Sequence, residues 1–412
     1  MRRAQAARPW FEHLNWLRPY HPDNPSVYTR WMPSPHLALK DLGVSLFASR
    51  SPPGRDAKPT NAAAQPACYR AFGAFRLFLA LLVVLSHSRD LGSAGAIAAL
   101  KPWGLGNIAV LGFFMLSGFI IAEALERFYA GRTGPFLANR FLRLFPPYLA
   151  ALALSVAIHL ALAGHGPVLT FDYDALPANL FGPGNLLSNL ILVFVWYGLD
   201  TLHLAPVYPF VRYVWAVSVE WLFYVLIAVV FVPALESMRR PVIVFAAALA
   251  VGYLYRYTRV SWFYPLTFAP YFVAGVCLYH AVQWRDRAAL IGAGVALALC
   301  YHHYYGYADR TREALIGGVL VVAIAPALAG LARLHLSAGW RKVDRFLGDL
   351  SYPVYLNHYV VTIALLNLTT GRSVSMIALS LTLSTLASLA LALLVEPLTR
   401  QVRNRFRGTA IS

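Results

Sequence analysis

The chain has 412 residues, of which 58% are hydrophobic and only 13% are charged. A soluble domain carries about 25% charged residues, so this composition excludes an ordinary soluble protein and predicts a chain that crosses a membrane many times. The formal net charge is +17, but the basic residues gather between apolar segments, which is typical of the cytoplasmic side of membrane proteins. We therefore expect contact with membrane lipid and no nucleic-acid partner.

The chain is expected to fall into three parts. Residues 1–70 are basic and rich in proline, and their segment 51–66 has the composition of a disordered linker. They contain no apolar core of a cleavable signal peptide near the first residue. We expect a disordered cytoplasmic extension over residues 1–70, a membrane domain over residues 71–399 and a basic cytoplasmic tail over residues 400–412.

Apolar segments follow one another through the membrane domain. Those expected to span the bilayer are residues 72–88, 108–125, 144–162, 213–235, 241–255, 266–282, 288–304, 314–334, 352–368 and 374–395. Residues 186–199 are apolar but short, which favours a re-entrant or interfacial segment. Alternation from a cytoplasmic start places every arginine-rich connection in the cytoplasm. The sequence thus predicts an all-α bundle of about ten transmembrane helices with both termini inside.

The first apolar segment carries an ionisable residue at each end, Arg76 and His87. A helix turns about 100° per residue, so the two side chains lie on nearly the same face, roughly 16 Å apart along the axis. If the helix enters the membrane at Arg76, His87 lies near the middle of a hydrocarbon core about 30 Å thick, where a titratable group marks a functional site. The alternative is an arginine that snorkels to the surface and a histidine that bonds a neighbouring helix.

The second apolar segment contains GFFMLSGF at residues 112–119. Its glycines allow close helix approach, and Ser117 offers a hydroxyl inside an apolar run, either for a site or for helix packing.

The next motif is NRFLRLFPPY at residues 139–148. Arg140 and Arg143 share a helix face at the expected cytoplasmic boundary, where two guanidiniums could hold phosphates bidentately or anchor anionic lipid. Pro146 and Pro147 fit the first turn of the third span better than a helix interior.

A carboxylate lies inside the motif WAVSVEWLFY at residues 215–224. Glu220 is flanked by Ser218, Tyr224 and other aromatic residues. A buried carboxylate is costly unless it is paired, so we expect a basic partner, with Arg76 or His87 as candidates. The alternative is a purely structural ion pair.

The last motif is LGDLSYPVYLNH at residues 347–358. Ser351, Tyr355 and His358 recur at helical spacing on one face, which suits either helix–helix hydrogen bonding or a site. Three cysteines, Cys68, Cys277 and Cys300, lack the spacing of a disulfide framework or a zinc site, and no bound metal is expected.

In this order, the motifs resemble those of the acyltransferase 3 family of bacterial integral membrane acyltransferases. The resemblance extends over about residues 70–400. It implies about ten helices in the bacterial inner membrane and transfer of an acyl group, often acetyl, from acyl-CoA to a hydroxyl of a cell-surface carbohydrate or glycolipid. Acyl-CoA would be a co-substrate, with no permanently bound cofactor.

Position by position, the resemblance implies a role for five residues. His87 and Arg76 match the essential pair of the first helix, Glu220 matches the carboxylate of the aromatic-rich motif, and Arg140 and Arg143 match the pair that serves the donor. We expect His87 to act as base or to accept the acyl group first.

Further residues are candidates for supporting roles. Glu220 or Asp90 could orient the ring of His87, and Ser117, Ser218, Tyr224 and His358 are supporting candidates. The main alternative function is a transporter or flippase for a glycan or lipid-linked intermediate. A purely structural membrane protein would leave the buried charges unexplained.

Overall fold

The computed structural model describes residues 69–129, 132–164, 168–170, 179–195, 208–231, 261–307 and 311–407. The expected extension lies outside these residues except for Tyr69 and Arg70, and the expected span 241–255 lies outside them entirely. A compact unit begins at Tyr69. Within the described residues the chain is helical and has no strand.

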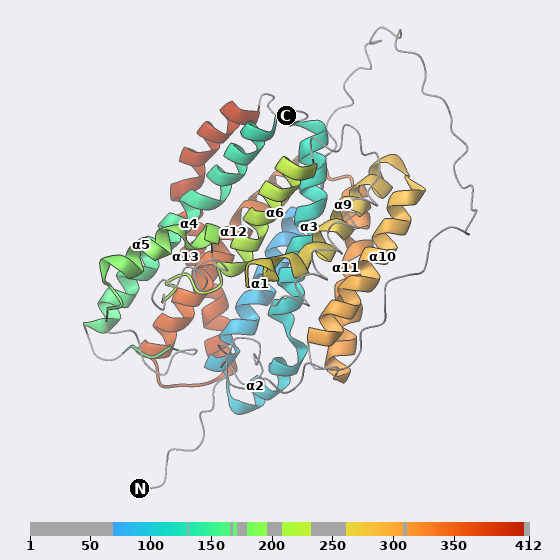
Figure 1. Cartoon of the computed structure of the whole chain (residues 1–412). Helices are drawn as coiled ribbons and strands as arrows, with labels where there is room; N and C mark the ends of the chain where they lie inside the picture. Colours follow the sequence, from blue (N-terminus) through green and yellow to red (C-terminus); the bar gives the residue numbers. More distant parts are fainter. Residues whose placement is uncertain are drawn as a thin grey trace, which may run out of the picture. The chain divides into compact units, whose positions relative to one another are not determined.

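The α-helices keep the labels of Figure 1. They are α1 (Gly73–Ser88), α2 (Ala94–Leu100), α3 (Leu105–Arg127), α4 (Thr133–Ala163), α5 (Pro183–Val195), α6 (Trp215–Leu226), α9 (Ala269–Trp284), α10 (Arg287–Tyr307), α11 (Arg312–Arg333), α12 (Ala338–Leu368) and α13 (Val374–Arg407). Short 3₁₀ turns are η2 (Arg89–Leu91), η3 (Lys101–Trp103) and η6 (Ser261–Phe268), and η5 (Ile227–Phe231) is a π-helical turn after α6.

Helix α1 lies among the other helices and not at their edge (Figure 1). It packs against α12, α3 and α13, because Leu79, Ala80, Val83 and Val84 are apolar on the sides that face these neighbours. Such packing places both ionisable residues of the first motif inside the bundle.

Close contact between α3 and α9 depends on two glycines. A Cβ atom at Gly118 would come within 2.1 Å of the Phe272 carbonyl oxygen, and one at Gly275 within 1.9 Å of the Met115 carbonyl oxygen. Neither position can hold a larger residue without separating the helices. The close approach expected at the motif of residues 112–119 is therefore confirmed at Gly118.

Five helical segments of the described chain are long and apolar enough to cross a membrane. They are Ala94–Arg127, Thr133–Ala163, Tyr264–Trp284, Arg312–Arg333 and Val374–Phe406. The protein is thus an all-helical membrane protein, whereas the expected count of about ten spans is not confirmed.

The remaining helices fall short of those requirements for identifiable reasons. Helix α1 has only 16 residues. Helix α5 has only 13 residues, and the expectation of a re-entrant or interfacial segment at 186–199 stays a prediction. Helix α12 is charged in its first half and carries Tyr, Asn and His in its second half, and α10 ends in a run rich in His and Tyr.

Three helices extend further than expected. Helix α4 begins at Thr133, so Pro146 and Pro147 lie in its interior, and their expected place in a first turn was wrong. A proline inside a membrane helix is tolerated where neighbouring helices support the backbone, and α12 packs against α4 here, with the Tyr352 hydroxyl donating to the Leu144 carbonyl at 3.0 Å. Helix α12 includes the basic residues of 341–345, and α13 continues through residue 400 to Arg407.

Candidate active site

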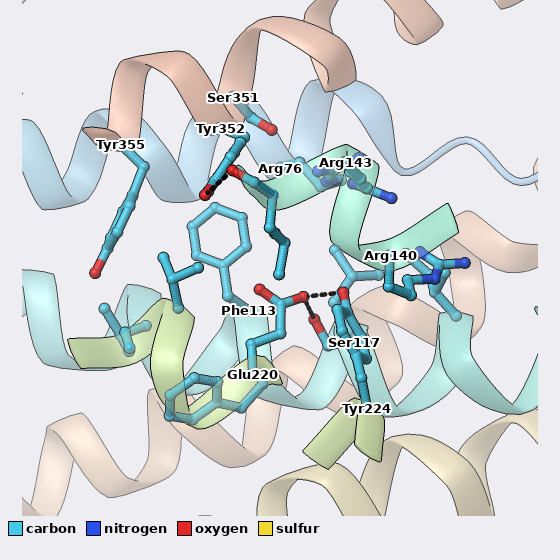
Figure 2. Close-up of a pocket in the computed structure, with 17 residues that line it drawn as sticks. Arg76, Phe113, Ser117, Arg140, Arg143, Glu220, Tyr224, Ser351, Tyr352 and Tyr355 are labelled. Carbon is cyan, nitrogen blue, oxygen red and sulfur yellow. Dashed lines mark hydrogen bonds between the residues drawn. The ribbon is translucent and has the colours of Figure 1, made fainter. Parts of the chain in front are cut away.

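A cavity lies between five helices, α1, α3, α4, α6 and α12 (Figure 2). It has an empty volume of about 670 Å³, part of which is open to solvent. All five sequence motifs contribute side chains to its wall. The polar and aromatic lining residues used below are Arg76, Phe113, Ser117, Arg140, Arg143, Glu220, Tyr224, Ser351, Tyr352 and Tyr355.

Three arginines reach this cavity from two helices. Arg76 comes from α1, and Arg140 and Arg143 come from successive turns of α4. The Arg140 guanidinium carbon lies 5.2 Å from the centre of the Phe136 ring and 5.5 Å from the centre of the Tyr224 ring. These cation–π contacts orient Arg140, while its Nε is buried without a hydrogen-bond partner. The cavity therefore has donors left over for an anionic ligand.

Glu220 faces the same cavity from α6 (Figure 2). Its Oε1 accepts a hydrogen bond from the Ser117 hydroxyl at 2.7 Å and another from the Tyr224 hydroxyl. The carboxylate thus bonds two hydroxyls, and no direct ion pair with Arg76 or His87 is found among the described residues, although Arg76 lines the same cavity and interacts electrostatically with Glu220. Ser218 is buried on α6 and does not line this cavity among its described walls.

The start of α1, and with it Arg76, is fixed by α12. The Asp344 carboxylate accepts hydrogen bonds from the backbone N–H groups of Gly73 at 2.9 Å and Ala74 at 2.8 Å. These are groups that the first turn of a helix leaves unsatisfied, and a negative charge there also suits the helix dipole. The Tyr69 hydroxyl donates to the same carboxylate at 2.8 Å. Burial, together with that hydrogen bond, raises the pKa of Tyr69, so it stays a donor.

His87 lies at the other end of α1, beside α12. Its Nδ1 is 2.9 Å from Nε2 of His358, and its ring stacks on Tyr213 with the ring centres 3.6 Å apart. Asp90 lies instead beside Arg89, with 3.7 Å between Oδ1 and Nε. The structure therefore places His358 against the His87 ring, and not Asp90 or Glu220.

Hydrogen bonding in this pair settles which nitrogen of His87 is free. His358 Nδ1 lies 2.6 Å from the Tyr355 carbonyl oxygen, which can only accept, so Nδ1 of His358 carries a proton. In the neutral pair Nε2 of His358 then accepts, and Nδ1 of His87 must donate to it. Nε2 of His87 is left with its lone pair, the arrangement that a general base or nucleophile requires.

Tyr355 separates this histidine pair from the cavity. Its side chain lines the cavity, its hydroxyl donates to the Tyr213 carbonyl at 2.6 Å, and its own carbonyl holds His358. In Figure 2, Arg140 and Arg143 lie on one side of the cavity and Tyr355 on the other. The candidate site thus has an arginine-rich part and a histidine pair, joined at Tyr355.

Three contributors were missed from the sequence. Tyr213 stacks on His87, Tyr352 lines the cavity and bonds α4, and Asp344 caps α1. A signal existed for the first two, because Tyr213 lies two residues before the first residue of the motif at 215–224 and Tyr352 lies inside the motif at 347–358. Asp344 had none, because its role depends on a helix 270 residues away.

Comparison with known proteins identifies the family. The family model for an acyltransferase domain, acyltransferase 3, matches residues 69–396. No curated protein and no solved structure matches the chain. The family match confirms the resemblance of the five motifs and covers nearly all of the described helices. The chain is therefore a membrane-embedded acyltransferase that belongs to the acyltransferase 3 family.

Proposed function

We propose that the protein transfers an acyl group, with acetyl the first candidate, from acyl-CoA to a hydroxyl of a cell-surface carbohydrate or glycolipid. The observation that carries this proposal is the His87–His358 pair, which leaves a lone pair on Nε2 of His87 next to a cavity with three arginines. Acyl-CoA combines phosphates, which suit guanidinium groups, with a slender arm that can enter an apolar cavity.

The donor would bind from the arginine-rich side of the cavity. Arg140 and Arg143 supply parallel N–H donors to phosphate oxygens, and the unpartnered Nε of Arg140 is available for one of them. Glu220 offsets part of the arginine charge and, through Tyr224, keeps an aromatic ring against Arg140. Arg76 extends the positive lining toward α12.

Two chemical routes use the same lone pair. In direct transfer, Nε2 of His87 takes the proton of the acceptor hydroxyl, whose oxygen attacks the thioester carbonyl, and the CoA thiolate leaves and recovers the proton. In the two-step route, Nε2 attacks the thioester carbonyl first and the thiolate leaves. The acceptor hydroxyl then takes the acyl group from the imidazole, and its proton passes to the thiolate. Both routes need the thioester to pass Tyr355 and reach His87.

A cytoplasmic donor and an outer acceptor would make the reaction a transfer across the bacterial inner membrane. The positive-inside pattern of the sequence supports this orientation, with both termini in the cytoplasm. His87, at the end of α1 remote from Arg76, would then meet the acceptor from the outer side.

Radiolabelled acetyl-CoA provides the test. Membranes that contain the protein should move label into a glycan or glycolipid fraction, and membranes from the same strain without the gene should not. Equal labelling of the two preparations would contradict the proposal, and glycan movement across the membrane without labelling would favour a transporter instead.

A further inference from the structure

A second cavity adjoins the first. It has an empty volume of about 400 Å³ and shares three lining residues with the first cavity, Arg76, Arg143 and Tyr352. These side chains therefore lie where the two cavities meet. The charged residues that line only the second cavity are Asp349, Glu396 and Arg403.

Arg403 is contributed by a part of the chain that the family match does not include. The match ends at residue 396, whereas α13 continues to Arg407. Two donors, one on α4 and one just before it, hold this extension. Asn139 Nδ2 donates to the Arg403 carbonyl at 3.3 Å, and Arg132, the residue before α4, donates to the Phe406 carbonyl at 3.5 Å. The last carbonyls of a helix lack intrahelical partners, so these bonds fix the end of α13 beside the turns that carry Arg140 and Arg143.

The guanidinium of Arg403 has unused hydrogen-bonding capacity. Its Nη1 donates to Glu396 Oε1 at 3.2 Å, while its Nε is buried without a partner. Arg140 Nε, on the neighbouring α4, is in the same state. Buried polar groups are normally paired, so two arginines with free buried donors beside cavities that share lining residues indicate a binding site for a ligand with several acceptor oxygens.

We infer that the second cavity binds the nucleotide end of the donor, and that Arg403 binds its terminal 3′-phosphate. This inference rests on acyl-CoA being the donor. Along that molecule the thioester comes first, then the pantetheine arm, the diphosphate and the 3′-phosphoadenosine. Arg76 and Arg143, where the cavities meet, suit the diphosphate together with Arg140, one turn before Arg143 on α4. Arg403, which lines only the second cavity, suits the phosphate farthest from the thioester.

Charge around Arg403 agrees with this assignment. The second cavity has three guanidiniums against two carboxylates, so it is left with a net positive charge that a phosphate can neutralise. Glu396 holds Arg403 while the donor is absent, and the guanidinium keeps further N–H groups for a phosphate.

Two donors that differ in one phosphate test the inference. Initial rates are measured with acetyl-CoA and with 3′-dephospho-acetyl-CoA for the wild type, Arg403→Gln, Arg403→Lys and the control Arg405→Gln, which changes an exposed arginine on the same helix. We expect the wild type to show a KM at least about tenfold higher for the dephospho donor, as the loss of a charged hydrogen bond implies. Arg403→Gln should raise the KM for acetyl-CoA to a similar extent and leave the KM for the dephospho donor and both kcat values unchanged.

Arg403→Lys should retain part of the discrimination between the donors, and Arg405→Gln all of it. The inference is overturned if Arg403→Gln raises KM equally for both donors, which indicates a structural role through Glu396, or if it changes neither. If Arg403→Gln does not accumulate in the membrane, the Lys variant decides. Undiminished discrimination between the donors together with an unchanged KM for acetyl-CoA would overturn the contact between the Arg403 guanidinium and the 3′-phosphate. A wild type inactive with both donors would instead refute the proposed function, and this inference with it.

Discussion

Replacing His358 should disable His87 while leaving donor binding intact. His358 Nε2 accepts a hydrogen bond from Nδ1–H of His87 at 2.9 Å. In the reactive tautomer of His87, which carries its proton on Nδ1 and has a lone pair on Nε2, His358→Phe leaves Nδ1–H without an acceptor. A buried donor without an acceptor costs about 1–3 kcal/mol. At about 1.4 kcal/mol per factor of ten, the population of the reactive tautomer and kcat should fall about 5- to 150-fold.

A conservative replacement separates positioning from simple packing. In His358→Gln the amide oxygen can accept from Nδ1–H of His87 and the amide N–H can donate to the Tyr355 carbonyl, which His358 now contacts at 2.6 Å. We therefore expect His358→Gln to keep most of the wild-type kcat and His358→Phe to show the full loss given above. The KM for acyl-CoA should be unchanged in both variants.

The assay is the rate of acetyl transfer per folded protein, with the folded fraction taken from size-exclusion chromatography in detergent. His159→Phe is the control, because it removes another buried and hydrogen-bonded imidazole, on α4 and away from the cavity. It should leave kcat per folded protein unchanged. Full activity of His358→Phe, or equal losses in the Phe and Gln variants, would refute the tautomer argument.

Three further predictions concern donor binding, stability and topology. Arg140→Ala or Arg143→Ala should raise the KM for acyl-CoA and leave the KM for the acceptor nearly unchanged. A Lys at either position should restore little, because its point charge cannot bind a phosphate bidentately. A change in the KM for the acceptor alone would indicate a lipid anchor instead. Asp344→Ala removes the acceptor of three hydrogen bonds and should lower the free energy of unfolding in detergent by about 2–4 kcal/mol, and an unchanged unfolding midpoint would contradict the capping role. Single cysteines at positions 166, 237 and 409 of an otherwise cysteine-free chain should react with an impermeant thiol reagent in intact cells at 166 only, and reaction at 237 would overturn the proposed orientation.

Helix positions followed closely from hydropathy. The expected spans at 72–88, 108–125 and 314–334 correspond to α1, α3 and α11 within a few residues. The prediction was wrong where a helix continues through a polar or proline-containing segment, as at the start of α4. The two adjacent prolines favour a helix start in the sequence. Contacts with α12, including the hydrogen bond from the Tyr352 hydroxyl, support the longer helix, and the sequence alone does not reveal such contacts.

The candidate site was only partly predictable. Motifs far apart in sequence do line one cavity, which their polar residues in apolar segments had indicated. The hydroxyl partners of Glu220 were not predicted, because a charged partner was expected and Tyr224, four residues on along the same helix and within hydrogen-bonding reach, was not considered. The His87–His358 contact joins residues 271 positions apart, and no local spacing could single it out from the alternative of simple helix packing.

The most direct measurement is acetyl transfer by His87→Ala compared with the wild type. Purified membranes containing equal amounts of each protein receive radiolabelled acetyl-CoA, and the label in the glycan and glycolipid fraction is counted over time. General base catalysis contributes about 10²–10⁴-fold, so we expect less than about a tenth of the wild-type rate. A His87→Ala protein that transfers acetyl groups at close to the wild-type rate would contradict the assignment of His87 as base or nucleophile.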